Sequence, residues 1–301
     1  MRAPRLHITP GMRHLLDYPK FRHPTRMLVL SSEYFFDRSW LRAAERLGWQ
    51  ARAVHSTMVG ALTRDDVAEL FRALATFKPD FILASNYAGM DVEGLFAHFL
   101  EDARIPYVSW FTDTPRMLLY DRRVHASHYA VAATWERSYM SNLTQLGFQH
   151  VLHMPLATDP ALFCGEPAQR FERDLAFVGC SMILLANEAW NTLAGRPALV
   201  HAIRRAVRDG TVTRTRFAQG IETVLGVALL ADLDASESRN VELALVYEAT
   251  RRQRQDMVQR LIPFGIEVRG DLVEKQQRQA LALGGAQARL GVRGDLVCLG
   301  K

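Results

Sequence analysis

The chain has 301 residues, of which 49% are hydrophobic and 23% are charged, and its net charge at pH 7 is +5. This composition is typical of a globular protein and excludes disordered and collagen-like classes. The mild positive charge suits anionic ligands, such as nucleotide phosphates or an acidic membrane surface met peripherally, without requiring nucleic acid.

Cysteine spacing and the length of apolar runs indicate the cellular compartment of the protein. Its three cysteines are far apart and form no CxxC pair, which argues against a disulfide framework or a zinc site and favours a reducing cytoplasm. The first 25 residues lack the continuous apolar core of a signal peptide. No run approaches the ~18 apolar residues of a membrane span. We therefore expect a cytoplasmic protein of roughly two domains.

The first half alternates short apolar runs with amphipathic segments. Residues 1–25 are expected to form an irregular, basic lead-in. Strands are then predicted at residues 26–30, 50–54, 80–84, 105–111, 128–133 and 150–154. Helices are predicted between them, at residues 37–48, 63–78, around 95–100 and 138–146. This alternation indicates an α/β domain at 26–165, built on a parallel, doubly wound sheet.

A proline-rich stretch, Pro155–Pro167, breaks the alternation and is interpreted as a linker. After it, residues 166–301 are expected to form a second domain. Three strands are predicted there, near Leu175, Ile266 and Leu296, with helices from Asn187 to about Gln259. A parallel sheet usually has about four to six strands. The second domain is therefore expected to be partial, and the chain an incomplete enzyme.

Asp113 is the most informative residue of the first domain. It lies between Thr112 and Thr114, where the apolar run 105–111 ends. Ligands of parallel sheets gather at the carboxyl ends of strands. The alternative is that Asp113 only caps the helix that begins near Pro115.

The other predicted strands of this domain also end in polar residues. A shared cleft above the strand ends would gather them, although loops are commonly polar anyway. The residues assigned to this cleft, beside Asp113, are Ser32, Glu33, Asn86, Tyr87, Thr112, Thr114, Trp135 and Glu136.

Further motifs carry weaker signals. Phe177–Ser181 predicts a strand followed by a glycine turn, but it lacks the GxGxxG fingerprint, so an NAD-type oxidoreductase is disfavoured. His125 and His128 lack a third metal ligand at suitable spacing. Asp232–Asp234 has a DxD form, for which helix capping is the favoured interpretation. Arg251–Arg254 is interpreted as a solvated helix face.

Several segments together resemble the CgeB-like (spore-maturation-protein-like) glycosyltransferases of the GT-B class. PLATDPALF is the most specific of them, and their order matches the end of one lobe and the start of the next. The segments are 110–115, 132–139, 146–148, 154–163 and 175–179.

The resemblance implies two Rossmann-like lobes with a cleft between them, the second lobe truncated in this chain. It further implies a nucleotide-sugar donor held mainly by the second lobe, an acceptor (a glycan, lipid or protein) met by the first, and no bound metal or other cofactor.

Roles for individual residues follow from this resemblance. Asp113 would orient or deprotonate an acceptor hydroxyl, since a carboxylate in a cleft suits general-base work. The donor diphosphate would meet Gly179 and Ser181, with Arg116 and Arg137 offsetting its charge. The alternative is a non-catalytic sugar- or nucleotide-binding module or scaffold with the same fold.

Overall fold

The computed structural model describes residues 8–32, 35–56, 63–119, 122–160, 175–180, 182–212 and 220–269. The chain divides into two compact units, Met1–Phe163 and Cys164–Lys301. Among the described residues, no helix is both long and apolar enough to cross a membrane.

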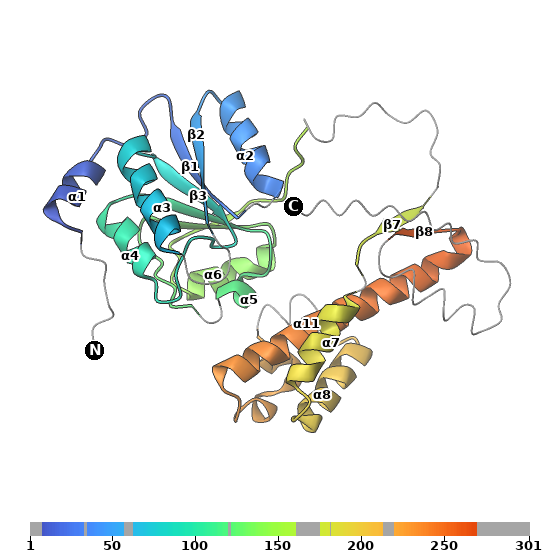
Figure 1. Cartoon of the computed structure of the whole chain (residues 1–301). Helices are drawn as coiled ribbons and strands as arrows, with labels where there is room; N and C mark the ends of the chain where they lie inside the picture. The colour runs from blue at the N-terminus through green and yellow to red at the C-terminus, as the bar shows by residue number, and fades with distance from the viewer. Residues whose placement is uncertain are drawn as a thin grey trace. The chain divides into compact units, whose positions relative to one another are not determined.

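The first unit is built on a six-stranded parallel sheet with the strand order β2-β1-β3-β4-β5-β6 (Figure 1). The expected α/β class and the parallel pairing of the first domain are confirmed. The strands are β1 (Arg26–Ser31), β2 (Gln50–His55), β3 (Phe81–Ser85), β4 (Tyr107–Phe111), β5 (Ala130–Thr134) and β6 (His150–His153).

Helices connect these strands and cover the sheet. They are α1 (Pro10–Leu16), α2 (Phe35–Arg46), α3 (Arg64–Phe77), α4 (Leu95–Asp102), α5 (Pro115–Leu119), η1 (Arg137–Tyr139) and α6 (Met140–Gln145). Local signals set their ends. Thr63 and Asp66 form a capping box at the start of α3, and Asp91 accepts hydrogen bonds from the first N–H groups of α4.

The alternation of side chains along the strands separates two apolar layers. Leu28 and Leu30 of β1 face the layer that holds α3, α4 and α6, whereas Met27 and Val29 face α2. Figure 1 accordingly shows α2 on one side of the sheet and α3 and α4 on the other. Both layers exclude water from β1, and each fully buried aliphatic side chain contributes about 1.5–3 kcal/mol.

The N-terminal lead-in is not wholly irregular, which corrects the expectation from sequence. Thr9 and Pro10 start α1 as N-cap and first residue. The Tyr18 hydroxyl then donates to the Pro79 carbonyl at 2.6 Å, and the buried Asp80 carboxylate accepts from the Arg26 backbone N–H at 2.6 Å. The basic composition of residues 1–25 does not indicate these contacts with the turn before β3.

The second unit is mainly helical in its described residues, instead of showing a second Rossmann-like sheet. Strands β7 and β8 form a two-stranded parallel sheet, which confirms two of the three expected strands. The third, near Leu296, lies outside the described residues. The elements are β7 (Ala176–Val178), α7 (Ile183–Thr192), α8 (Pro197–Arg208), α10 (Glu222–Leu225), η2 (Val227–Leu229), α11 (Ala235–Leu261), η3 (Ile262–Phe264) and β8 (Glu267–Arg269).

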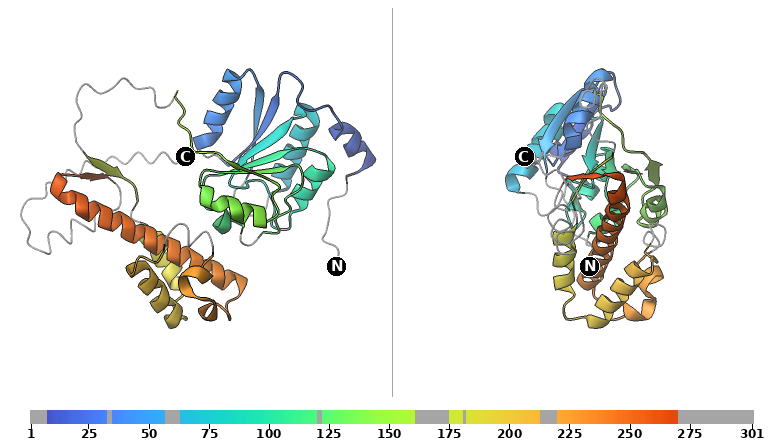
Figure 2. Two further views of the ribbon diagram at one scale, coloured as in Figure 1. Left: turned by 180° about the vertical axis from the view of Figure 1, so that it is seen from behind. Right: turned by 90° about the vertical axis from the view of Figure 1, so that its right-hand side faces the viewer.

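The long helix α11 organises this second unit. Near its start, Val241 and Leu245 pack with Leu199 and Ile203 of α8 in an apolar cluster. Near its end, Val258 packs in a separate cluster with Phe177 of β7. Figure 2 shows α11 as the long orange helix beside the shorter helices. One helix therefore serves two apolar cores.

Candidate functional site

The strand order makes the carboxyl ends of β1 and β3 a candidate binding edge. From β1 the chain moves to β2 on one side, and from β2 it crosses to β3 on the other side of β1. In sheets of this order, ligands bind at that reversal, outside the carboxyl ends of the strands. Side chains that follow β1 and β3 are therefore the first candidates for binding.

Buried hydroxyls gather at this reversal. Ser32 follows β1, Ser56 follows β2 and Ser85 ends β3, and their hydroxyl oxygens have no hydrogen-bond partner within the described part of the chain. Ser56 and Ser85 are 2% and 0% exposed. Unsatisfied buried polar atoms are uncommon in folded proteins and indicate water or a ligand. Glu33, assigned to the same place, lies outside the described residues.

Asn86 holds the loop after β4. Its side-chain oxygen accepts the backbone N–H groups of Thr112 at 2.9 Å and Asp113 at 3.1 Å. Its side-chain nitrogen donates to the Asp113 carboxylate at 2.6 Å. Asn86 itself has a φ of +51° and is 2% exposed. Asparagine is one of the few residues that tolerate this left-handed conformation, so the sequence fits the turn that it builds.

Asp113 is exposed, while its supporting partner is buried. Among the described residues, no backbone N–H of α5 donates to its carboxylate, as the capping alternative would require. The carboxylate is thus oriented by one amide and remains open to solvent. This arrangement suits a group that exchanges a proton with a bound molecule.

Neighbouring loops along the same edge are linked in turn. The Thr114 hydroxyl lies 3.2 Å from the Tyr139 hydroxyl, which joins the loops after β4 and β5. His153 Nε2 donates to the Trp135 carbonyl at 3.1 Å, which joins the ends of β5 and β6. Glu136 is half-buried beside Trp135. The edge is therefore a connected row of loops, of which the sequence analysis missed Tyr139 and His153.

Tyr87 does not belong to the open edge, which corrects its assignment to an acceptor cleft. Its φ of +63° turns the ring into the core, where it is 2% exposed and lies 5.8 Å from the Tyr107 ring. Burial raises the pKa of Tyr87 and that of Tyr107, so both phenols keep their protons. The Tyr107 hydroxyl donates to the Ala88 carbonyl at 2.9 Å.

Gly89 allows the same turn to approach β1. A Cβ there would lie 2.5 Å from Leu30 Cδ1 and 3.0 Å from the Ser56 hydroxyl oxygen. Its φ of +79° is also a conformation that side chains disfavour. The loop after β3 therefore fits closely against the ends of β1 and β2, where the unsatisfied hydroxyls lie.

The residues assigned to a donor diphosphate lie in both units. In the first, Arg116 is half-buried in α5 and Arg137 is exposed in η1. In the second, Gly179 forms a bend directly after β7. Ser181 lies outside the described residues.

Arg254 is a cation at the Gly179 turn that the sequence analysis placed on a solvated helix face. Its guanidinium donates to the Cys180 carbonyl at 2.6 Å. Sequence spacing does not reveal this contact, because Arg254 lies on α11, 74 positions away along the chain.

The other motifs have structural roles. Asp234 caps α11 by accepting the Glu237 N–H at 2.8 Å, which confirms the capping interpretation of the DxD motif. His128 lies 3.5 Å from the Gln149 side-chain oxygen, whereas His125 contacts Glu101. The two histidines thus have different partners.

No protein-family model, curated protein or solved structure matches the chain.

Proposed function

We propose that the protein is a glycosyltransferase of GT-B type, which transfers a sugar from a nucleotide-sugar donor to an acceptor hydroxyl. The observation that carries this proposal is the exposed Asp113 carboxylate, held by the buried Asn86 at the carboxyl edge of a parallel sheet. The resemblance of 105–180 to CgeB-like enzymes supplies the reaction class. The acceptor is a glycan, lipid or protein.

In this proposal Asp113 acts as the general base. It takes the proton of an acceptor hydroxyl while the hydroxyl oxygen bonds to the anomeric carbon of the donor sugar. The bond from that carbon to the diphosphate oxygen breaks, and the nucleoside diphosphate leaves with the bonding electrons. A positioned carboxylate typically contributes about 10²–10⁴-fold to such a step. Asn86 acts through Asp113 and is a positioning residue.

The donor diphosphate is assigned to the Gly179 turn. The turn precedes α7, and the N–H groups at a helix start attract anions. Arg254 adds a guanidinium beside the same turn.

The test is turnover of a panel of nucleotide sugars, with release of the nucleoside diphosphate as the signal. Asp113→Asn should lower turnover by about 10²-fold or more in a folded protein. Asp65→Asn, which changes an exposed carboxylate on α3, is the matched control and should be as active as the parent. Equal activity of the Asp113→Asn variant and its parent would contradict the assigned base.

The alternative is a non-catalytic sugar- or nucleotide-binding module. The observation in its favour is the two-stranded sheet of the second unit, where the described residues show no larger donor-binding sheet. Calorimetry with UDP- and GDP-sugars separates the two functions. Binding without turnover in the parent protein would favour the module, and turnover that depends on Asp113 would favour the enzyme.

A further inference from the structure

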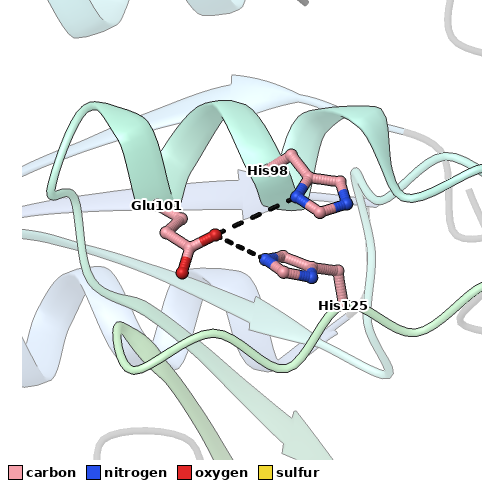
Figure 3. Close-up of side chains that lie close together, drawn as sticks. All are labelled: His98, Glu101 and His125. Atoms are coloured by element: carbon pink, nitrogen blue, oxygen red, sulfur yellow. Dashed lines mark hydrogen bonds and ion pairs between the residues drawn. The ribbon is translucent and has the colours of Figure 1, made fainter. Parts of the chain in front are cut away.

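Three potential metal ligands converge in the first unit, apart from the carboxyl edge. They are His98 and Glu101 of α4 and His125 of the segment that leads into β5, and their ligand atoms all lie within 4.8 Å of one another. Figure 3 shows both imidazole rings directing a nitrogen towards the same carboxylate oxygen of Glu101. His128, which the sequence paired with His125, contacts Gln149 instead.

The distances approach those of a tetrahedral zinc site. His125 Nε2 lies 2.6 Å and His98 Nδ1 lies 3.9 Å from Glu101 Oε2. Ligand atoms at zinc–ligand distances of about 2.0–2.2 Å in a tetrahedron are roughly 3.3 Å apart. Both separations differ from this value by less than about 1 Å, which side-chain rotation supplies without backbone movement.

The local fold fixes the backbone that carries two of these side chains. His98 and Glu101 are three residues apart on one helix, so they share a face. The carboxylate of Asp91 accepts the N–H groups of Leu95 at 2.9 Å and Phe96 at 2.7 Å, which fixes the start of that helix. The two imidazole rings stack with their centroids 3.5 Å apart, so binding one ion rotates them out of this stack.

The segment that carries His125 is held independently. The Arg123 N–H donates to the Val92 carbonyl at 2.8 Å. A Cβ at Gly94 would lie 2.6 Å from the Arg123 carbonyl oxygen and 3.7 Å from His125 Cβ. Only a glycine therefore allows this approach of the segment to α4. The backbone that carries the three ligands is thus fixed from two elements, and side-chain rotation completes the site.

We propose that His98, Glu101 and His125 bind one Zn²⁺ ion, with solvent in the fourth position. Two imidazoles and one carboxylate are a ligand set of borderline softness that suits zinc, whereas Mg²⁺ and Ca²⁺ prefer oxygen ligands. The side chains of His98, His125 and Glu101 are 17%, 28% and 39% exposed, so an ion can enter and retain a water. Binding displaces the proton that His125 Nε2 shares with Glu101 Oε2.

The proposed zinc site is independent of the proposed transferase chemistry. Glu101 lies in the last turn of α4, shortly before the amino-terminal end of β4, and His125 precedes β5. Asp113 follows the carboxyl end of β4, at the opposite edge of the sheet. A failure of either proposal therefore leaves the other unchanged.

The experiment is a calorimetric titration of the tag-free, metal-stripped full chain with ZnCl₂, and with MgCl₂ as the comparison salt. One Zn²⁺ per chain and no Mg²⁺ are expected. His98→Gln and Glu101→Gln should each weaken zinc affinity by at least about tenfold. Removing a residue that only hydrogen-bonds to a zinc ligand already costs about 10–100-fold. His128→Gln, which changes a histidine that contacts Gln149, should bind zinc as the parent does.

Cobalt gives an independent readout. Co²⁺ in the parent protein should show the visible absorption of a four-coordinate site, which His98→Gln should abolish while circular dichroism confirms folding. His98→Gln leaves the hydrogen bond between His125 and Glu101 intact, so its effect reports metal binding rather than loss of that contact. Absence of zinc binding by the folded parent, or unchanged affinity in both ligand variants, overturns the proposal.

Discussion

The two units gather their functional residues in different ways. In the first, parallel strands end at one edge, so Asn86 and Asp113 meet although they are 27 positions apart in the chain. In the second, helices pack along their sides, and the residue proposed for ligand contact, Gly179, lies in a turn next to Arg254. A parallel sheet collects polar groups from many loops, whereas a helical cluster offers few such meeting points.

The largest expected loss of stability concerns the apolar core that packs on the sheet. Phe99 of α4 is 1% exposed and stacks with Phe96 in the main apolar cluster. Phe99→Ala should lower the free energy of unfolding by about 3–5 kcal/mol, because it leaves a cavity that close-packed neighbours cannot fill. Urea denaturation measures the loss. Leu47→Ala, at a position 60% exposed, is the control and should change stability by about 0.5 kcal/mol at most.

Truncating a core residue of the second unit should also lower the free energy of unfolding, but by less. Leu245 of α11 is 0% exposed, whereas Met257 of the same helix is 41% exposed. Leu245→Ala should cost about 2–5 kcal/mol, and Met257→Ala much less. The comparison uses urea denaturation of both variants. Equal losses would show that the cluster around Leu245 is not the core of this unit.

A smaller effect is expected where the edge is held by polar contacts. Asn86→Ala removes the acceptor of two backbone N–H groups and the donor to Asp113, so it should cost about 1–3 kcal/mol. Turnover should fall as well, because the Asp113 carboxylate loses its orientation. Thermal unfolding and nucleotide-sugar turnover measure the two effects. Asn187→Ala, at an exposed position of α7, should alter neither.

The smallest effect concerns acid stability at the start of α3. Hydrogen bonds from the Thr63 hydroxyl and backbone N–H lower the pKa of Asp66 below its ordinary value of 3.8. Because the folded pKa is the lower one, the contribution is present above 3.8 and is lost as the pH falls through the lowered value.

Asp66→Asn should therefore flatten the dependence of stability on pH below about 4, measured by urea midpoints. Asp65→Asn, one position earlier and without this capping bond, should keep the dependence of the parent. A parent-like dependence in Asp66→Asn would contradict the assignment.

The sequence predicted the sheet well because buried parallel strands are continuous apolar runs, of which Met27–Leu30 is an example. It located Asp113 and Asn86 because strand ends are recognisable. It misassigned Tyr87, since only the backbone conformation shows that the ring turns inward. It missed the partnership of His125 with His98 and Glu101, because packing, not spacing, brings them together.

Two separate apolar clusters lie along α11, and they constrain where residues can be inserted into this helix. Its 27 residues extend about 40 Å, and Leu245 and Val258 must face their separate cores at the same time. Each residue adds a rotation of about 100°. Inserting one residue between them would turn Val258 away from Phe177, whereas inserting seven, close to two full turns, would restore its direction. The direction in which each apolar face of α11 points therefore depends on the phase of the helix.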